Sequence, residues 1–213
     1  MNYYLSIGSN LGDRLEFLQF AVTELSQFST IEKASAIYET EAIGFETENL
    51  FLNACLHVKS SVKPDDLLRK IHHIEQKAGR IRYNDGQYHS RPLDIDIIFC
   101  DDLILSTENL ILPHPKFNDR KFVLLPLTDL SENLIDPLSK KSINNLLEDC
   151  LDNTKVEQRQ LTLFIWQLIN NLFFNTKYLT NIVLKFGKNL NEVYEKTKHQ
   201  RFSVSCCSWF FSN

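Results

Sequence analysis

The sequence predicts a mixed α+β fold in which helices flank a central, mostly antiparallel sheet. The first observation behind this prediction concerns the spacing of apolar residues. Segments in which they recur at every second residue alternate along the chain with segments in which they recur at every third or fourth. The second is size and composition, because 213 residues that are 43% hydrophobic and 23% charged can form one full core with an appendage. The third is a strand-like run that carries Asp94 and Asp96 on one side.

The chain opens with a strand that leads into a helix. Residues 3–7 are aromatic and aliphatic except for Ser6, and turn-forming residues with two glycines follow them at 8–13. This turn lacks the Lys-Ser/Thr ending of a nucleotide-binding P-loop. Asp13 can cap a helix over residues 15–28, where apolar side chains recur at spacings of three and four. We expect that helix to face the core.

Two further strands are expected at residues 31–38 and 50–58. In the second of these, Phe51 and Asn53 fall on one face, opposite a row of aliphatic residues. An aromatic ring beside an amide offers a flat surface next to a group that both donates and accepts hydrogen bonds. The alternative is a core aromatic with a satisfied asparagine. The loop at 39–49 is long enough to bend over the edge of a ligand.

A second helix is expected to begin at Pro64 and to end before Gly79. A polar loop that contains an Asn-Asp-Gly turn follows at residues 82–90. Three arginines stand at the ends of this loop: Arg80, Arg82 and Arg91. They are either solvated loop residues or, beside carboxylates, groups that hold phosphates.

The strand after this loop is the centre of the functional hypothesis. Because side chains alternate along a strand, Asp94 and Asp96 are expected to share one face with Ile98. The other face is expected to hold Leu93, Ile95, Ile97 and Phe99. Two carboxylates roughly 7 Å apart repel each other, and Mg²⁺ binds such groups together with substrate phosphates. With the arginines nearby, this pattern predicts phosphoryl transfer, and solvated aspartates are the alternative.

The remaining segments complete the order of the fold. His114 stands between two prolines, which restrict its backbone. Arg120 and Phe122 follow on a short helix, and residues 142–151 favour another capped helix. The order strand, helix, strand, strand, helix, strand is that of a ferredoxin-like sandwich.

Charge and cysteine content limit the classes of function. A formal net charge of -4 argues against a general binder of nucleic acids or membrane surfaces. The five cysteines show no Cys-x-x-Cys spacing, so we expect neither a disulfide framework nor a structural zinc site. The sequence shows no basic segment followed by an apolar signal region at its start, and the expected compartment is the cytoplasm.

Seven motifs occur in the order found in one known family. They are Ile7-Gly8-Ser9-Asn10-Leu11-Gly12, Tyr38-Glu39-Thr40, Phe51-Leu52-Asn53-Ala54, Ile74-Glu75 with Gly79-Arg80-Ile81-Arg82, Arg91-Pro92-Leu93-Asp94-Ile95-Asp96-Ile97, Pro113-His114-Pro115 and Arg120-Lys121-Phe122. In these residues the chain resembles the 6-hydroxymethyl-7,8-dihydropterin pyrophosphokinase family (2-amino-4-hydroxy-6-hydroxymethyldihydropteridine diphosphokinases). The resemblance covers residues 1–156, and seven ordered matches are far more specific than one motif.

The resemblance implies an ATP-dependent diphosphotransferase of folate biosynthesis. Such an enzyme moves the terminal diphosphate of ATP to the hydroxymethyl group of a reduced pterin and releases AMP. By the same resemblance, Asp94 and Asp96 hold two Mg²⁺ ions, with ATP as co-substrate. Arg80 and Arg91 then stabilise charge on the phosphates, and the loop between them closes over ATP. The residues implied to contact ATP are Glu75, Arg82, Tyr88, Ile97, His114 and Arg120.

The resemblance also implies a pterin site formed by Thr40, Ile43, Gly44, Phe51, Asn53 and Phe122. Phe51 and Phe122 are expected to sandwich the ring, while Asn53 and nearby backbone groups bind its polar edge. The chain departs from the family in the arginine loop. Gln87-Tyr88-His89-Ser90 stands where the family usually carries a further Arg next to a Trp, and Tyr88 can replace the Trp.

The C-terminal part of the chain matches no motif of this family. We therefore expect a catalytic domain over residues 1–158 and a tail of unknown role, α-helical in structure, over 159–213. The apolar run in the tail is interrupted by Asn170 and Asn171 and is short of a membrane span. The expected partners are ATP and a reduced pterin, with no nucleic acid and no membrane. We expect a monomer, with association through the tail as the alternative.

Two other classes of function are open at the level of sequence. A metal-dependent nucleotide-sugar transferase also binds a diphosphate through Asp-x-Asp and a cation, but this leaves Phe51, Asn53 and the arginines unexplained. A non-enzymatic module that binds RNA on its sheet would need aromatics within a basic surface, and the charge balance opposes that. Release of AMP from ATP would distinguish the diphosphotransferase from these two alternative classes.

Overall fold

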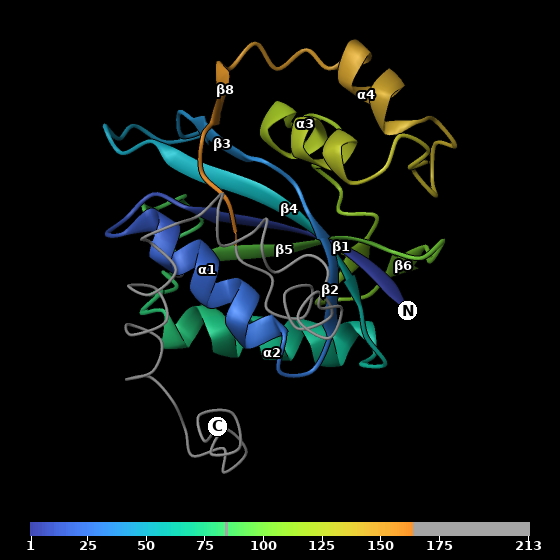
Figure 1. The fold of residues 1–213 in the computed structure, drawn as a ribbon, viewed down its shortest axis with the longest axis horizontal. Coiled ribbons are helices and arrows are strands. Elements are labelled where there is room, and N and C mark those ends of the chain that lie inside the picture. The colour runs from blue at the N-terminus through green and yellow to red at the C-terminus, as the bar shows by residue number, and fades with distance from the viewer. Residues whose placement is uncertain (84, 164–213) are drawn as a thin grey trace, which may run out of the picture. The chain divides into compact units, whose positions relative to one another are not determined.

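The structure, a computed structural model, describes residues 1–83 and 85–163, which form a sheet with helices on both faces (Figure 1). The strands are β1 (Asn2–Ser9), β2 (Thr30–Ala34), β3 (Ile37–Thr40), β4 (Phe51–Lys59), β5 (Asp94–Cys100), β6 (Leu105–Ser106), β7 (Ile111–Leu112) and β8 (Val156–Arg159), and the helices are α1 (Arg14–Leu25), α2 (Pro64–Lys77), α3 (Lys121–Leu130) and α4 (Ile143–Asp149). Among the described residues, no helix has the length and apolar character needed to cross a bilayer.

The chain divides into two compact units, Met1–Gln167 and Leu168–Asn213. The α-helical appendage expected in the tail lies, from residue 164 onward, outside the described residues. Leu161 and Leu163, by contrast, pack against the core of the first unit. The division expected at residue 158 stays a prediction.

Strand β1 lies inside the main sheet and pairs antiparallel with β4 on one side and with β5 on the other. The strand order is β5-β1-β4-β3-β8, and β2 also pairs with β4. The predicted α+β class with a mostly antiparallel sheet is confirmed. In the register of the sheet, Gly8 is opposite both Asn53 of β4 and Asp94 of β5. Residues far apart in the sequence therefore meet at the C-terminal end of β1.

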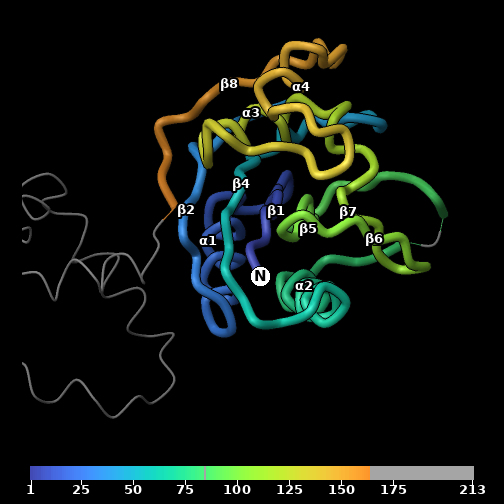
Figure 2. The backbone as a smooth tube through the Cα atoms, turned by 90° about the vertical axis from the view of Figure 1, so that its right-hand side faces the viewer, coloured from blue at the N-terminus to red at the C-terminus, as the bar shows by residue number. Residues whose placement is uncertain are grey.

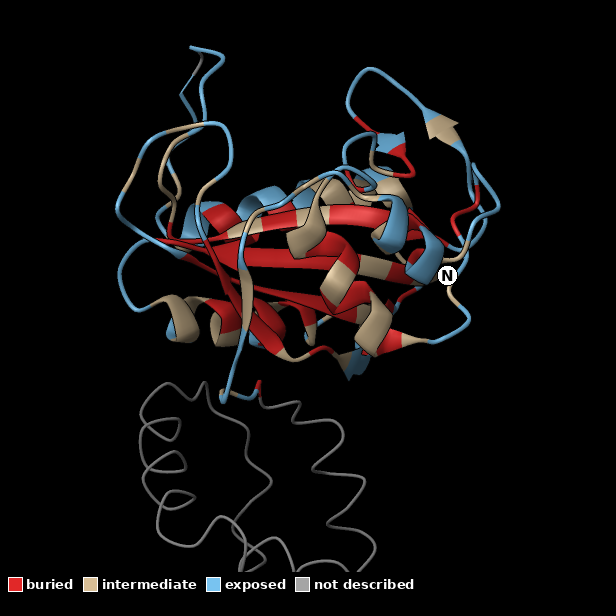
Figure 3. Cartoon of the chain, turned by 90° about the horizontal axis from the view of Figure 1, so that it is seen from above, coloured by how far each residue is buried: buried red, intermediate tan, exposed pale blue. Residues whose placement is uncertain are grey.

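Helices α1 and α2 cover one face of the sheet, and α3, with α4 beside it, covers the other (Figures 1 and 2). The first hydrophobic cluster joins Leu18 of α1 and Leu67 of α2 to the strands, and the second joins Leu124 of α3 and Ile143 of α4 to Phe99. Figure 3 shows the strands as largely buried.

The predicted helix starts are confirmed by their capping contacts. Asp13 Oδ1 accepts a hydrogen bond from the backbone N–H of Glu16 at 3.0 Å, and Ser142 caps α4 in the same way. Pro64 is the first residue of α2, and Gly79, after its end, has a φ of 88°.

The single strand expected at residues 31–38 was wrong, because the chain forms β2 and β3 with a break between them. At the break, Ser35 Oγ accepts from the backbone N–H of Cys55 at 2.8 Å, and the N–H of Ala36 donates to Asp129 Oδ2 at 3.0 Å. These contacts to β4 and α3 replace the continuous ladder. The sheet also gains β8, which pairs with β3 and was not expected.

The alternation expected along β5 was wrong at one position. Tyr4 pairs with Phe99 and Leu5 pairs with Ile97, so Ile98 is the extra residue of a β-bulge. Phe99 consequently packs in the same cluster as Ile98, on the α3 side, and not with Ile95 and Ile97. The bulge follows the two aspartates in the chain, and Asp94 and Asp96 are both only partly buried.

Candidate active site

Two cavities meet at Asp94 and Asp96. The first, which we call the aromatic cavity, measures about 360 Å³, and the second, the arginine cavity, about 300 Å³. Of the residues expected from the sequence, Thr40, Ile43, Phe51, Asn53, Tyr88, Arg91, Arg120 and Phe122 line the aromatic cavity, whereas Glu75, Arg80, Arg82, Ile97 and His114 line the arginine cavity. The structure thus gathers the expected residues, except Gly44, into two groups joined by the two carboxylates.

Near Asn53, the aromatic cavity is shaped by packing and by a neutral hydrogen bond. Phe51 and Asn53 come from the start of β4 and are 7% and 3% exposed. The side-chain amide of Asn53 donates to Thr40 Oγ1 at 2.8 Å, which fixes its orientation. A Cβ added at Gly8 would lie 2.8 Å from Asn53 Oδ1, so glycine leaves the room that this amide occupies. The amide is thereby held beside the ring of Phe51.

The two aspartates differ in their charged neighbours. Asp94 pairs with Arg80 through Oδ1 and with Arg91 through Oδ2, the latter at 2.5 Å. Burial opposes ionisation of Asp94, but the two guanidinium groups outweigh it and lower its pKa. Asp96 is 3.8 Å from Arg120, and burial together with the charge of Asp94 raises its pKa to about 7. Below about pH 7 the pair therefore favours a single negative charge in the absence of a cation.

Glu75 of α2 is a buried carboxylate that connects the arginines to β5. Its side chain is 1% exposed, accepts from the backbone N–H of Ile95 at 2.9 Å and pairs with Arg80 at 2.5 Å. The other oxygen pairs with Arg82. Burial raises the pKa of Glu75, and the arginines act in the opposite direction. This network holds Arg80 between Glu75 and Asp94.

His114 lies in the arginine cavity, where its backbone N–H donates to the carbonyl of Ile98 at 3.0 Å. Burial and the charge of Arg120 lower its pKa to about 4. Its Nδ1 accepts from the backbone N–H of Lys116 at 3.2 Å, which assigns the proton of the neutral ring to Nε2. The ring can therefore donate a hydrogen bond from Nε2.

Tyr88 lies in the aromatic cavity, away from the side where the expected ATP contacts gather. Its hydroxyl accepts from Lys116 Nζ at 3.1 Å and from Arg120 at 3.4 Å. These contacts, with Lys116 first, lower the pKa of the phenol. Gly44 has a φ of 87° and lies against the Tyr88 ring.

Several cavity residues were missed by sequence reasoning. In the aromatic cavity they are Ser6, Glu41, Phe45, Lys116 and Asp119, and in the arginine cavity they include Leu68, Glu108 and Leu110. Most of them stand in loops or outside any quoted motif, so their positions depend on the tertiary structure. Asn10 carried a signal as part of the first motif. It is buried, and it binds the backbone N–H of Arg91 at 2.7 Å and Ser90 Oγ at 3.0 Å.

The oxygen donors of the site suit a hard divalent cation. Within residues 1–83 and 85–163, no group of three or more His, Cys, Asp or Glu side chains forms a complete cage for a metal. Asp94 and Asp96 are the carboxylates that both cavities share. Two carboxylates with further positions left for phosphate and water match the coordination habit of Mg²⁺.

An antiparallel α+β sandwich with paired acids between a cavity lined by aromatic rings and a cluster of arginines is typical of one class, the enzymes that transfer phosphoryl or diphosphoryl groups. Comparisons with known proteins identify the family within this class. The model of the 7,8-dihydro-6-hydroxymethylpterin-pyrophosphokinase (HPPK) family matches residues 4–132. The chain belongs to this family, which decides against the two alternative classes.

Relatives at moderate identity support the assignment. A 2-amino-4-hydroxy-6-hydroxymethyldihydropteridine pyrophosphokinase of Aquifex aeolicus is 40% identical over 141 residues, covering 66% of this chain and 86% of that protein. One of Porphyromonas gingivalis is 42% identical over 131 residues, covering 60% and 89%. The folic acid synthesis protein fol1 of Pneumocystis carinii is 36% identical over 151 residues, which are 70% of this chain but 20% of that longer protein.

Solved structures show the same fold at lower identity. The wild-type HPPK-DHPS of Plasmodium falciparum has a TM-score of 0.56 and 17% identity, over 70% of this chain and 44% of that one. The chain thus spans less than half of these structural neighbours, and at this identity the likeness concerns the fold alone.

Proposed function

We propose that this chain transfers the terminal diphosphate of ATP to 6-hydroxymethyl-7,8-dihydropterin, giving the pterin diphosphate and AMP, in folate biosynthesis. The match with relatives named as pyrophosphokinases covers most of the length of each relative. The observation that supports the placement of the substrates is that a cavity with flat rings and a cavity with arginines meet at two carboxylates. The pterin would occupy the aromatic cavity, ATP the arginine cavity, and the transferred group the region between.

The aromatic cavity offers the contacts that a pterin ring requires. Phe51 and Phe122 would stack on its faces, and the Asn53 amide, held by Thr40, would pair with its polar edge. Backbone groups around Ile43 and Gly44 would bind the rest of that edge. The buried, hydrogen-bonded Asn53 discriminates against rings whose edge cannot pair with it, because its polar atoms would then be left without partners.

Asp94 and Asp96 would hold two Mg²⁺ ions together with the phosphates. Bound there, the cations supply charge neutralisation at the transferred group and orient both substrates. The carboxylates suit this role because each remains accessible from both cavities.

The arginines would exchange partners when ATP binds. In the free protein Arg80 and Arg91 neutralise Asp94, and the same guanidinium groups suit bidentate contacts with phosphate oxygens. His114 would donate from Nε2, and Arg120 would add a further charge. Glu75, Arg82 and Ile97 line the region where the nucleotide would lie. The contact of Tyr88 with ATP stays a prediction from the resemblance, because Tyr88 lines the aromatic cavity.

The reaction then needs positioning more than covalent participation of the protein. The pterin hydroxyl oxygen would attack the β-phosphorus, the bond from that phosphorus to the α–β bridging oxygen would break, and the oxygen would leave with AMP. The proton of the hydroxyl would pass to water as the new oxygen–phosphorus bond forms, and AMP would leave as its phosphate anion. The arginines stabilise the charge that spreads over the phosphate oxygens.

We propose that the chain acts in the cytoplasm as a monomer. The free thiols of Cys55, Cys100 and Cys150 fit a reducing compartment. One copy of the chain supplies the residues of both cavities, so the chemistry needs no partner subunit. Association through the tail is the alternative.

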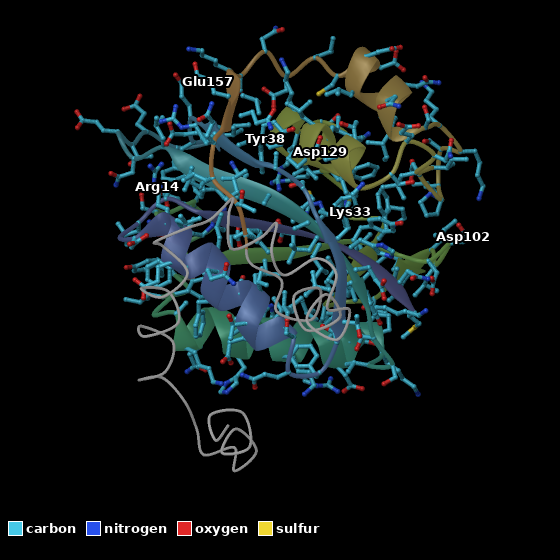
Figure 4. All side chains as sticks on the ribbon, viewed as in Figure 1. Arg14, Lys33, Tyr38, Asp102, Asp129 and Glu157 are labelled. Atoms are coloured by element: carbon cyan, nitrogen blue, oxygen red, sulfur yellow. The ribbon has the colours of Figure 1, made fainter. Side chains whose placement is uncertain are left out.

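The test is to incubate the chain with ATP, Mg²⁺ and 6-hydroxymethyl-7,8-dihydropterin and to separate the nucleotides. We expect AMP and the pterin diphosphate in equal amounts. ADP, or no product, would contradict the proposal. Asp102→Asn is the matched control for changes at the site, because Asp102 is an exposed aspartate in the turn after β5 (Figure 4).

A further inference from the structure

The two ends of the loop at residues 41–50 lie side by side at the aromatic cavity, and we call this base of the loop, formed by Thr40 and Phe51, its neck. Thr40, at the end of β3, pairs with Phe51, at the start of β4, and both residues line the cavity. Ile43 and Phe45 of the loop line it as well. The spacing of the two strands at this neck therefore sets the distance between the ring of Phe51 and the loop that faces it.

Arg14, which has no assigned role, joins the two sides of this neck. Its Nη1 donates to the carbonyl of Leu50 at 2.8 Å, next to Phe51, and lies 2.8 Å from Glu39 Oε1, next to Thr40. A single guanidinium thus connects Glu39, the residue before the neck, to Leu50, the last residue of the loop. Figure 4 shows Arg14 at the start of α1.

The contact with Arg14 gives a positive partner to Glu39, a carboxylate that is almost buried. Its side chain is 10% exposed, and its other oxygen lies 3.2 Å from Arg159 of β8. A carboxylate this far from water needs positive partners, and Arg14 and Arg159 supply them. Helix stability does not explain Arg14, because a positive side chain in the first turn opposes the helix dipole. We therefore attribute the position of Arg14 to its contacts with Glu39 of the sheet and Leu50 of the loop.

We propose that Arg14, acting through Glu39 and Leu50, is a positioning residue that sets the neck of the 41–50 loop for binding of the pterin. Without its guanidinium, the carbonyl of Leu50 loses a charged donor, and among the described residues Glu39 keeps Arg159 as its ion-pair partner. The loop then samples wider openings, and the contacts around Ile43 to the ring weaken. The nucleotide side is unaffected, because the arginine cavity contains neither the loop nor its neck.

This inference rests on the proposed function only in naming the pterin as the ring that binds, so binding is measured apart from turnover. The Kd of 6-hydroxymethyl-7,8-dihydropterin is measured by titration calorimetry in the presence of Mg²⁺ and α,β-methylene ATP, and the Kd of the ATP analogue is measured alone. Arg14→Met keeps the aliphatic stem, Arg14→Lys keeps the charge, and Arg69→Met is the control, because Arg69 forms an exposed ion pair with Asp66 on α2.

Arg14→Met is expected to weaken pterin binding roughly tenfold, equivalent to about 1.4 kcal/mol, and to change the Kd of the ATP analogue less than twofold. Arg14→Lys should recover part of the loss, and Arg69→Met should change neither constant. An unchanged pterin Kd, or equal losses for both ligands, would overturn the inference. If Arg14→Met does not fold, Glu39→Gln answers the same question. Absence of AMP from the unaltered chain that still binds the pterin would count against the proposed reaction alone.

Discussion

Two cavities meet at Asp94 and Asp96, and the part of the aromatic cavity around Asn53 keeps its shape by forces different from those in the arginine cavity. In the aromatic cavity, Phe51 and Asn53 are buried in the sheet, and the amide is fixed by a neutral hydrogen bond to Thr40. In the arginine cavity, the side chains are fixed by ion pairs among Glu75, Arg80 and Asp94 and their neighbours. Packing and neutral hydrogen bonds persist across pH and salt, whereas charge networks depend on both.

This difference matches the two kinds of ligand that the cavities would take. A flat ring is selected by shape, so a preformed slot loses little entropy when the ring binds. A triphosphate is selected by charge, and a buried cluster of arginines without counterions would be costly before it arrives. In the free protein, Glu75 and Asp94 serve as those counterions. We therefore expect changes in the aromatic cavity to act on substrate affinity and changes at the aspartates to act on turnover and on stability.

The largest expected effect is at Asp94. Asp94→Asn should lower kcat by roughly 10²- to 10³-fold or more, the size of removing one preorganised electrostatic contact. It should also lower the free energy of unfolding by about 3 kcal/mol, because Arg80 and Arg91 lose their common partner in a site where their side chains are 16% and 17% exposed. Steady-state AMP release and urea unfolding measure the two quantities. Asp102→Asn should change neither, and a variant with unchanged kcat would remove Asp94 from the mechanism.

A smaller effect, confined to affinity, is expected at Gly8. In Gly8→Ala the new methyl group would lie 2.8 Å from Asn53 Oδ1, so the Asn53 amide must turn and its bond to Thr40 weakens. The displaced group is the end of a side chain, and the fold is expected to persist. The KM for the pterin should rise roughly tenfold with the KM for ATP unchanged, the cost of misplacing one polar contact.

Thr40→Val tests the same contact without a steric change, because it removes the hydroxyl that accepts from Asn53 and keeps the shape of the side chain. A rise in the KM for ATP in either variant would contradict the division of roles between the two cavities.

Local periodicity predicted most of the helices and strands, because caps, Pro64 and the alternating residues act over short distances. It also placed Asp94 and Asp96 on one face. It did not predict the break between β2 and β3, which depends on contacts of Ser35 with Cys55 and of Ala36 with Asp129. Nor did it predict the bulge at Ile98, which is a property of the pairing with β1.

For the site, the sequence predicted which residues lie close together but not how they divide between the two cavities. The motifs contained the aromatic residues, the acids and the arginines, and the resemblance ordered them by substrate. The meeting of Asn53 and Asp94 at the aromatic cavity follows from the register in which Gly8 faces Asn53 on one side and Asp94 on the other. Such long-range pairings leave no local pattern. The placement of Tyr88 against Gly44 and Lys116 likewise depends on three loops at once, and the roles of all these residues stay predictions.

The smallest effect concerns the stability of the metal-free protein and separates the two aspartates. The pKa of Asp96 is raised to about 7 from an ordinary value of 3.8, so between these values the folded chain holds a proton that the unfolded chain has released. Stability therefore falls as the pH rises through this window and stays at its lower level above pH 7. Asp96→Asn removes that loss, so in EDTA its melting temperature should exceed that of the unaltered chain at pH 8 by more than at pH 5.

Solvent reaches 35% of the Asp96 side chain, so the gain at pH 8 should be modest, about 2–4 °C, the shift that about 1 kcal/mol produces in a domain of this size. Thermal melts of Asp96→Asn, Asp94→Asn and Asp102→Asn at both pH values measure it. The opposite signs expected for the first two variants follow from their surroundings, since Asp94 is paired with two arginines and Asp96 only approaches one. A loss of stability in Asp96→Asn at pH 8 would mean that the contact with Arg120 outweighs the repulsion from Asp94, and the two acids would then be equivalent supports of the arginine cavity.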